Sequence, residues 1–116
     1  MLKNFFLAAI VGLIIFAGGL AEAEEIYVGN SFATGHDLYL LTDTISRDYE
    51  HKMVIYSATI KTLDSFDNEY FIDYKFFDLD EDGEDVRFTN SEGERGLVDE
   101  YDTPLEWKMF MIVRDY

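Results

Sequence analysis

Acidic residues alternate along one short segment of the chain, and carboxylates at that spacing could bind calcium. The segment reads Asp78-Leu79-Asp80-Glu81-Asp82-Gly83-Glu84. Aspartates at alternate positions followed by glycine form the first half of an EF-hand-type loop, in which carboxylates converge on one cation and glycine allows a sharp turn. The candidate metal ligands are therefore Asp78, Asp80, Asp82 and Glu84.

The second half of this motif is missing from the sequence. If Asp78 is position one, position twelve is Thr89, where a glutamate would normally supply two oxygens. Residues 76–77 and 86–88 have the composition of strands rather than of flanking helices. We therefore favour an acidic β-turn with Asp82-Gly83 as its turn pair. Calcium is the alternative, with weak affinity expected, and no other cofactor is predicted.

The other residue types that commonly do chemistry do not form a catalytic pattern. His36 and His51 are isolated in the sequence, whereas metal sites usually need several convergent ligands. The chain contains neither a Gly-x-Ser-x-Gly nucleophile motif nor a glycine-rich phosphate loop. With 24 acidic residues, a plausible catalytic carboxylate pair has little specificity. We predict that the protein is not an enzyme.

Trp107 is the one tryptophan of the chain and a candidate partner-binding residue. Tryptophan is enriched at binding hot spots. In a helix that begins near Pro104, it would lie beside Met111 and away from the main apolar stripe. Burial at the edge of the core is the alternative interpretation for an aromatic residue in a small domain.

The first 23 residues have the order of a secretory signal peptide. Lys3 is followed by an apolar run from Phe5 to Ala21, and Ala21-Glu22-Ala23 offers small residues at the cleavage site. A permanent membrane anchor is the alternative, but the run is shorter than the roughly 20 residues of a spanning helix. We expect cleavage before Glu24, export to the periplasm, the cell surface or the medium, and no stable membrane insertion afterwards.

The net charge of −15 restricts the classes of partner. Removing residues 1–23 takes away one lysine and one glutamate, so the mature chain keeps this charge. Nucleic acid is excluded as a partner, because its binding requires clustered Lys and Arg. A protein or cell-surface partner is compatible with this charge, and a basic one would be attracted by it.

The absence of cysteine makes the exported domain depend on its apolar core. The chain contains no cysteine, so disulfides, thiol chemistry and lipid anchoring through cysteine are excluded. Disordered acidic chains have few aromatic residues, whereas aromatics make up 16% of this chain. We therefore predict one folded domain over residues 24–116.

Period-two patterns predict an antiparallel sheet. In 52–63 and 69–79, apolar residues alternate with polar ones and 64–68 would form the connecting hairpin loop. One face of each strand should be buried, namely Val54, Tyr56, Ala58 and Ile60 in the first and Tyr70, Ile72, Tyr74 and Phe76 in the second. The remaining strands are predicted at 26–28, 38–45, 85–89 and 95–99.

The C-terminal segment is predicted to be a helix. Thr103-Pro104-Leu105-Glu106 has a capping residue, a proline at the first helical position and a glutamate in the first turn. A terminal strand over 108–114 is the alternative, since 109–113 is continuously apolar. The helix should pack on the sheet with Val113 beside a stripe formed by Leu105, Met109, Ile112 and Tyr116.

The layout of the chain resembles that of small exported bacterial proteins related to surface-adhesin protein E. The segments that carry the resemblance are Ile26-Tyr27-Val28-Gly29, the strand Leu38-Tyr39-Leu40-Leu41-Thr42-Asp43-Thr44-Ile45, the turn Asn90-Ser91-Glu92-Gly93 and the Trp-containing C-terminal helix. The resemblance implies a curved antiparallel sheet with the helix lying against it. It also implies an envelope or adhesion role.

These observations together predict an α+β fold, with a curved antiparallel β-sheet of five or six strands and a C-terminal α-helix packed on it. The function that we expect is that of a small secreted or cell-envelope, non-catalytic binding module of the adhesin type. A secreted acidic inhibitor of a basic enzyme is the first alternative. A weak calcium-binding envelope protein is another.

Overall fold

The computed structural model describes residues 24–116 of the chain. The predicted signal peptide, residues 1–23, lies outside the described residues. Within 24–116, six strands follow one another and a helix comes last. Their bounds are β1 (Glu25–Asn30), β2 (Asp37–Glu50), β3 (Met53–Leu63), β4 (Glu69–Asp78), β5 (Val86–Asn90), β6 (Arg95–Leu97) and α2 (Pro104–Asp115).

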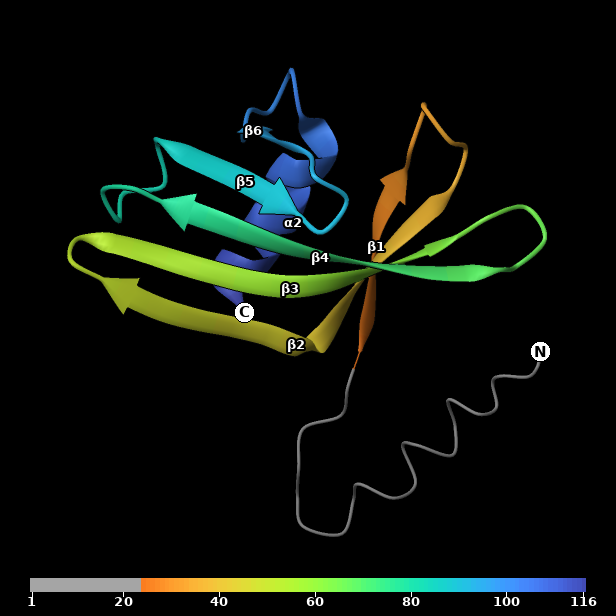
Figure 1. The fold of residues 1–116 in the computed structure, drawn as a ribbon, viewed down its shortest axis with the longest axis horizontal. Coiled ribbons are helices and arrows are strands. Elements are labelled where there is room, and N and C mark those ends of the chain that lie inside the picture. Colours follow the sequence, from red (N-terminus) through yellow and green to blue (C-terminus); the bar gives the residue numbers. More distant parts are fainter. Residues whose placement is uncertain (1–23) are drawn as a thin grey trace, which may run out of the picture.

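The strands form one antiparallel sheet in which each strand pairs with the next along the chain, in the order β1-β2-β3-β4-β5-β6. The sheet curls into a half-barrel, and α2 packs on its concave side (Figure 1). This confirms the predicted α+β fold with a curved sheet and a C-terminal helix. The alternative of a terminal strand over 108–114 was wrong.

Strand β2 is longer than the sequence pattern predicted. The predicted end was Ile45, but the strand continues to Glu50 and turns back into β3 at His51 and Lys52. Residues 46–50 are mostly polar and show no apolar alternation, so period-two analysis could not find them. His51 adopts a φ of 58°, a turn conformation that sequence analysis more readily expects of glycine. The other strands match their predicted ranges to within two residues at each end.

A bulge in β2 explains part of the curvature. The register of β2 against β3 shifts between Leu41 and Ser46. Within this bulge, the Thr44 hydroxyl donates to the Leu41 carbonyl at 2.6 Å and accepts from the Thr59 amide at 2.8 Å. The side chain thus replaces a missing backbone partner in the ladder. Bulges bend a strand and increase its twist, which helps the sheet to curl around α2.

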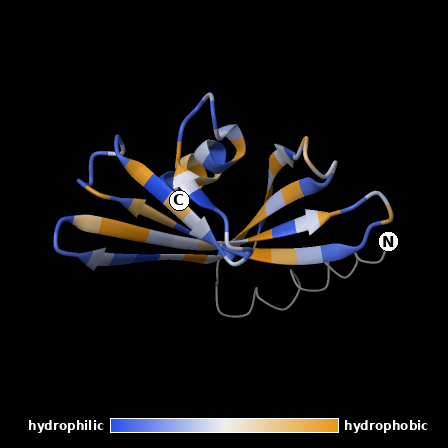
Figure 2. Cartoon of the chain, turned by 45° about the horizontal axis from the view of Figure 1, so that its top comes forward, coloured by the Kyte–Doolittle hydropathy of each residue, from blue (hydrophilic) through white to orange (hydrophobic). Residues whose placement is uncertain are grey.

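The concave face of the sheet supplies most of the core, as the alternation predicted. Apolar residues alternate with polar ones along the strands, and the helix lies over the sheet (Figure 2). Of the eight side chains predicted to be buried on β3 and β4, only Tyr70 is exposed, at 49%. The buried seven are Val54, Tyr56, Ala58, Ile60, Ile72, Tyr74 and Phe76.

The buried face of α2 differs from the predicted stripe. The predicted stripe ended at Tyr116, which is 57% exposed, whereas Phe110 was not part of it and is fully buried. The ring of Phe110 meets Tyr56 edge-on, with centroids 5.6 Å apart, because the curved sheet reaches around one side of the helix. The fully buried helix residues are Met109, Phe110 and Val113.

The predicted capping box does not form. Thr103 precedes the helix as expected, but its side chain makes no cap hydrogen bond. Its hydroxyl instead donates to the Leu97 carbonyl at 2.8 Å and accepts from the Asp99 amide at 2.7 Å. The Glu106 carboxylate accepts a hydrogen bond from the Tyr74 hydroxyl at 3.0 Å. Both side chains are thus used to attach the helix to the sheet and to the preceding loop.

Gly29 allows the first turn of α2 to lie against β1. A Cβ atom at this position would be 2.8 Å from Cδ2 of Leu105, and the φ of 156° is rare for other residues. The register of β1 against β2 also shifts here. The position therefore requires glycine for close packing between the helix and the edge strand.

Candidate functional site

The acidic segment forms the loop between β4 and β5, residues 79–85. Asp78, the last residue of β4, is 2% exposed, and both of its carboxylate oxygens accept from the Gly83 amide, at 3.1 and 3.0 Å. Glu81 and Gly83 both have positive φ, at 61° and 77°. The segment is therefore a loop closed on the Asp78 carboxylate, longer than a tight turn at Asp82-Gly83.

The predicted calcium ligands do not gather into a cluster in this structure. Asp80, Asp82 and Glu84 are exposed, and Asp82 accepts a hydrogen bond from the Glu84 amide at 2.9 Å. Across residues 24–116, no group of three or more His, Asp or Glu side chains is arranged to hold a metal ion. Calcium binding by this loop stays a prediction, and a calcium-dependent rise in melting temperature that magnesium does not reproduce would support it.

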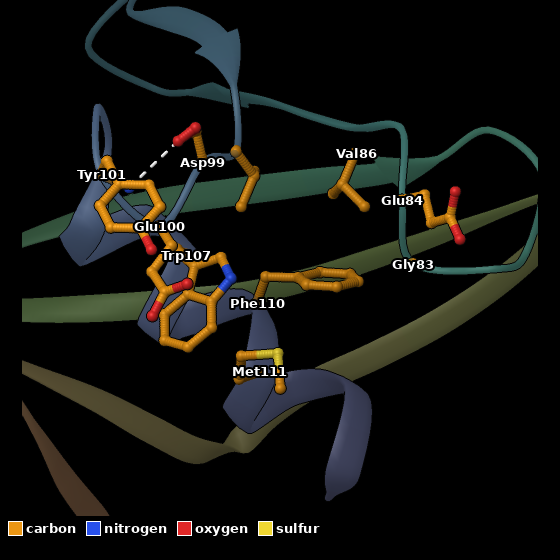
Figure 3. A pocket seen from close by; sticks show the side chains of 10 residues that line it. Gly83, Glu84, Val86, Asp99, Glu100, Tyr101, Trp107, Phe110 and Met111 are labelled. Carbon is orange, nitrogen blue, oxygen red and sulfur yellow. Dashed lines mark hydrogen bonds between the residues drawn. The ribbon is translucent and has the colours of Figure 1, made fainter.

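Trp107 lines a pocket of about 240 Å³ beside the helix (Figure 3). The side chain is half-buried at the edge of the core, and its role in binding a partner stays a prediction. On one side lie Phe110 and Met111 of α2, and on another lies Val86 of β5. The remaining lining residues come from two loops and are Gly83, Glu84, Val98, Asp99, Glu100 and Tyr101.

The structure thus brings two separately predicted features to one place. Glu84 of the acidic loop and Trp107 of the helix line the same pocket, although 22 intervening residues separate them in the sequence. Asp80 and Asp82 do not line this pocket, and Asp78 closes the loop by accepting the Gly83 amide. The acidic loop contributes the backbone of Gly83 and the carboxylate of Glu84 to this pocket.

The loop from Val98 to Thr103 supplies the part of the pocket that sequence analysis missed. The Asp99 side chain accepts from the Tyr101 amide at 3.0 Å, which folds the loop into a tight turn. This turn displays Glu100 and Tyr101, and Tyr101 is 85% exposed. A signal was available in the sequence, since Asp99 followed by Thr103 and Pro104 is typical of a turn that leads into a helix.

The pocket combines aromatic rings with negative charge. Glu84, Asp99 and Glu100 are the ionisable residues that line it, together with the phenol of Tyr101. The guanidinium of Arg114 lies next to Gly83, within 3.0 Å of the position that a Cβ atom would take. Three carboxylates and one adjacent guanidinium leave a net negative site. Aromatic faces next to carboxylates are suited to binding a cationic side chain.

Comparisons with known protein families, with curated proteins and with solved structures find no match for this chain. In the part of the chain that the structure describes, no helix is long and apolar enough to cross a membrane.

Proposed function

We propose that the protein is an exported, non-catalytic binding module that recognises a basic segment of a protein or cell-surface partner. The observation that carries the proposal is the half-buried Trp107 in a pocket that also presents Glu84, Asp99 and Glu100. A Lys or Arg side chain could stack on the indole and pair with the carboxylates. The adhesin-type role implied by the family resemblance is one setting for such recognition.

The net charge of −15 supports the same class of partner. A strongly acidic surface attracts basic partners over distances of about a Debye length, roughly 8 Å at physiological ionic strength. An inhibitor of a basic enzyme would use the same chemistry, with the basic segment lying at the enzyme's active site. Loss of activity of a cationic secreted enzyme on adding the protein would identify this second candidate.

The proposal can be tested with the fluorescence of Trp107, because the chain has no other tryptophan. We would titrate the protein with a Lys/Arg-rich peptide and with an acidic peptide of equal length. The basic peptide should shift the emission saturably at low salt, and added salt should weaken the binding. The acidic peptide should have no effect. Equal responses to the two peptides would exclude the proposal.

Variants at the pocket separate specific recognition from general charge attraction. Trp107→Ala should cost about 2 kcal/mol of binding free energy, or roughly thirty-fold in Kd, as expected at a hot spot. Glu100→Gln should weaken binding more than Asp67→Asn does. Asp67→Asn also removes one negative charge, but from the β3–β4 loop, which lies at the opposite end of β4 from the β4–β5 loop that lines the pocket. Because Trp107→Ala has no tryptophan emission, its affinity for the peptide is measured by calorimetry.

A further inference from the structure

A second cavity, of about 350 Å³, lies on the other side of α2 from the Trp107 pocket. Residues 31–36, between β1 and β2, form one wall, and the turn between β5 and β6 forms another. The β1–β2 hairpin and the helix rise on the same side of the sheet (Figure 2). Strands β3 and β4 provide the floor between them, so the cavity lies inside the half-barrel.

The ionisable groups that line this cavity are mostly acidic. They include three carboxylates, Glu92, Glu94 and Glu106, and neither Lys nor Arg is among the described residues that line it. One oxygen of Glu106 accepts from the Tyr74 hydroxyl at 3.0 Å, and one oxygen of Glu94 accepts from the Asn90 amide group at 2.8 Å. The second oxygen of each carboxylate remains available to a ligand.

A buried hydroxyl also lines the cavity. Thr62 on β3 is only 4% exposed, and the structure gives its side chain no hydrogen-bond partner among residues 24–116. Burying a hydroxyl without a partner is unfavourable, so such groups normally bind protein, water or ligand. The position of Thr62 in the floor therefore indicates that the cavity receives a molecule with a polar group.

The rest of the lining is apolar or aromatic. Leu38, Ile72 and Met109 supply aliphatic surface from the sheet and from the helix. At the rim, the rings of His36 and Tyr70 stack with centroids 6.0 Å apart and planes inclined by 10°. A ligand that fills this space needs a short apolar body in addition to its charged group. The volume lies in the usual range for sites of small molecules.

We propose that this cavity binds a small organic amine, a protonated amino group carried on a short aliphatic or aromatic body. The ammonium would lie among Glu92, Glu94 and Glu106, and a second polar atom would reach Thr62. The body would pack on the aliphatic floor beside the stacked rings. This site is separate from the pocket proposed above for a basic segment of a macromolecule.

The test compares amines with alcohols of the same shape by calorimetry at low salt. The probes are 2-phenylethylamine with 2-phenylethanol, and 1,5-diaminopentane with 1,5-pentanediol. At least one amine should bind saturably, and its alcohol should bind at least roughly tenfold more weakly, because charge-assisted hydrogen bonds are lost. If both amines titrate like their alcohols, the proposal is wrong.

Two variants test the assigned residues. Glu106→Gln keeps an acceptor for Tyr74 and removes the charge, so amine binding should weaken at least roughly tenfold. Asp48→Asn removes one charge at an exposed position near the far end of β2, where the strand pairs with Ile55 and does not line this cavity, so it should leave amine binding unchanged. Thr62→Val should weaken binding without lowering the melting temperature, since the hydroxyl has no partner in the protein. Equal amine affinities in wild type and in either cavity variant would overturn the assignment.

The readouts of the two proposals are independent. Trp107→Phe should weaken binding of the basic peptide and leave amine binding unchanged, because the two sites lie on different sides of α2. Glu106→Gln should have the opposite pattern. A variant that abolishes both activities would show that the two pockets act as one site, which contradicts the inference.

Discussion

At the scale of single residues, the contact between Tyr74 and Glu106 ties the helix to the sheet. Tyr74 is 4% exposed, and its hydroxyl donates to the Glu106 carboxylate. Burial, followed by the negative charge of Glu106, raises the pKa of Tyr74 far above its ordinary value of 10.0. Burial also raises the pKa of Tyr56. Both phenols are therefore held in the protonated form in the folded state.

The raised pKa predicts a loss of stability in strong alkali. In the unfolded chain Tyr74 gives up its proton near pH 10, whereas in the folded chain it keeps the proton to higher pH. Its contribution to stability is therefore complete below pH 10 and falls as pH rises above it, by about 1.4 kcal/mol per pH unit. Urea unfolding between pH 9 and 11 should give a smaller decline for Tyr74→Phe. If the free energy of unfolding falls equally with pH in wild type and in Tyr74→Phe, Tyr74 is not the source of the decline.

At the scale of elements, the loop between β4 and β5 depends on the residue that precedes it, Asp78. Asp78 is buried at the end of β4 and accepts the Gly83 amide with both oxygens. Asp80, two positions further along, is exposed. The two aspartates looked equivalent in the sequence, because alternation alone does not show which carboxylate points into the protein. The structure gives them different roles.

Substitution of these two aspartates should therefore have unequal effects on stability. Asp78→Ala leaves the Gly83 amide without its partner, so the free energy of unfolding should fall by about 1–3 kcal/mol. Asp80→Ala, at an exposed position, should change it by no more than about 0.5 kcal/mol. Urea denaturation of both variants measures the difference. Equal losses would show that Asp78 does not close the loop.

The predicted elements were correct where local pattern decides structure and wrong where neighbours decide it. Alternation predicted the buried faces of β3 and β4, and Pro104 predicted the start of α2. The capping box was wrong because the Thr103 and Glu106 side chains have better placed partners in the β6–α2 loop and on β4. A sequence pattern that is correct locally can thus lose to a tertiary contact.

At the scale of the whole molecule, the charge of −15 is not balanced by many ion pairs. Within residues 24–116 the salt bridges are few, and the closest joins Lys61 to Glu25 at 2.7 Å on the face of the sheet away from the helix. Excess charge of one sign destabilises a compact state through self-repulsion. The aromatic core must offset this repulsion without disulfides.

This imbalance predicts that salt stabilises the protein. Raising sodium chloride from about 0.02 to about 0.5 M shortens the Debye length several-fold and screens the repulsion between carboxylates. The melting temperature at pH 7 should therefore rise with salt. At pH 4.5, where many carboxylates are partly protonated, the rise should be smaller. Thermal unfolding followed by circular dichroism checks both statements, and a melting temperature that falls with sodium chloride at pH 7 would contradict them.

The sequence by itself determined the class of fold and the two residues that led to the first pocket. Strand periodicity, Pro104 and aromatic content are local or compositional properties, so an α+β domain and its buried strand faces followed from them. Trp107 and Glu84 were likewise identifiable by residue type. The prediction of an exported binding module also came from the sequence, and it awaits the binding experiments.

Only the tertiary structure decided which of these residues meet. Curvature of the sheet and the approach of α2 to Gly29 bring Glu84 and Trp107 to the lining of one pocket, and Thr62 and Glu106 to the lining of another. Such contacts join residues far apart in the chain, and no local pattern encodes their distance. The alternation of aspartates predicted a cation site, which stays a prediction, and only the structure showed that the Asp78 carboxylate accepts the Gly83 amide and closes the loop.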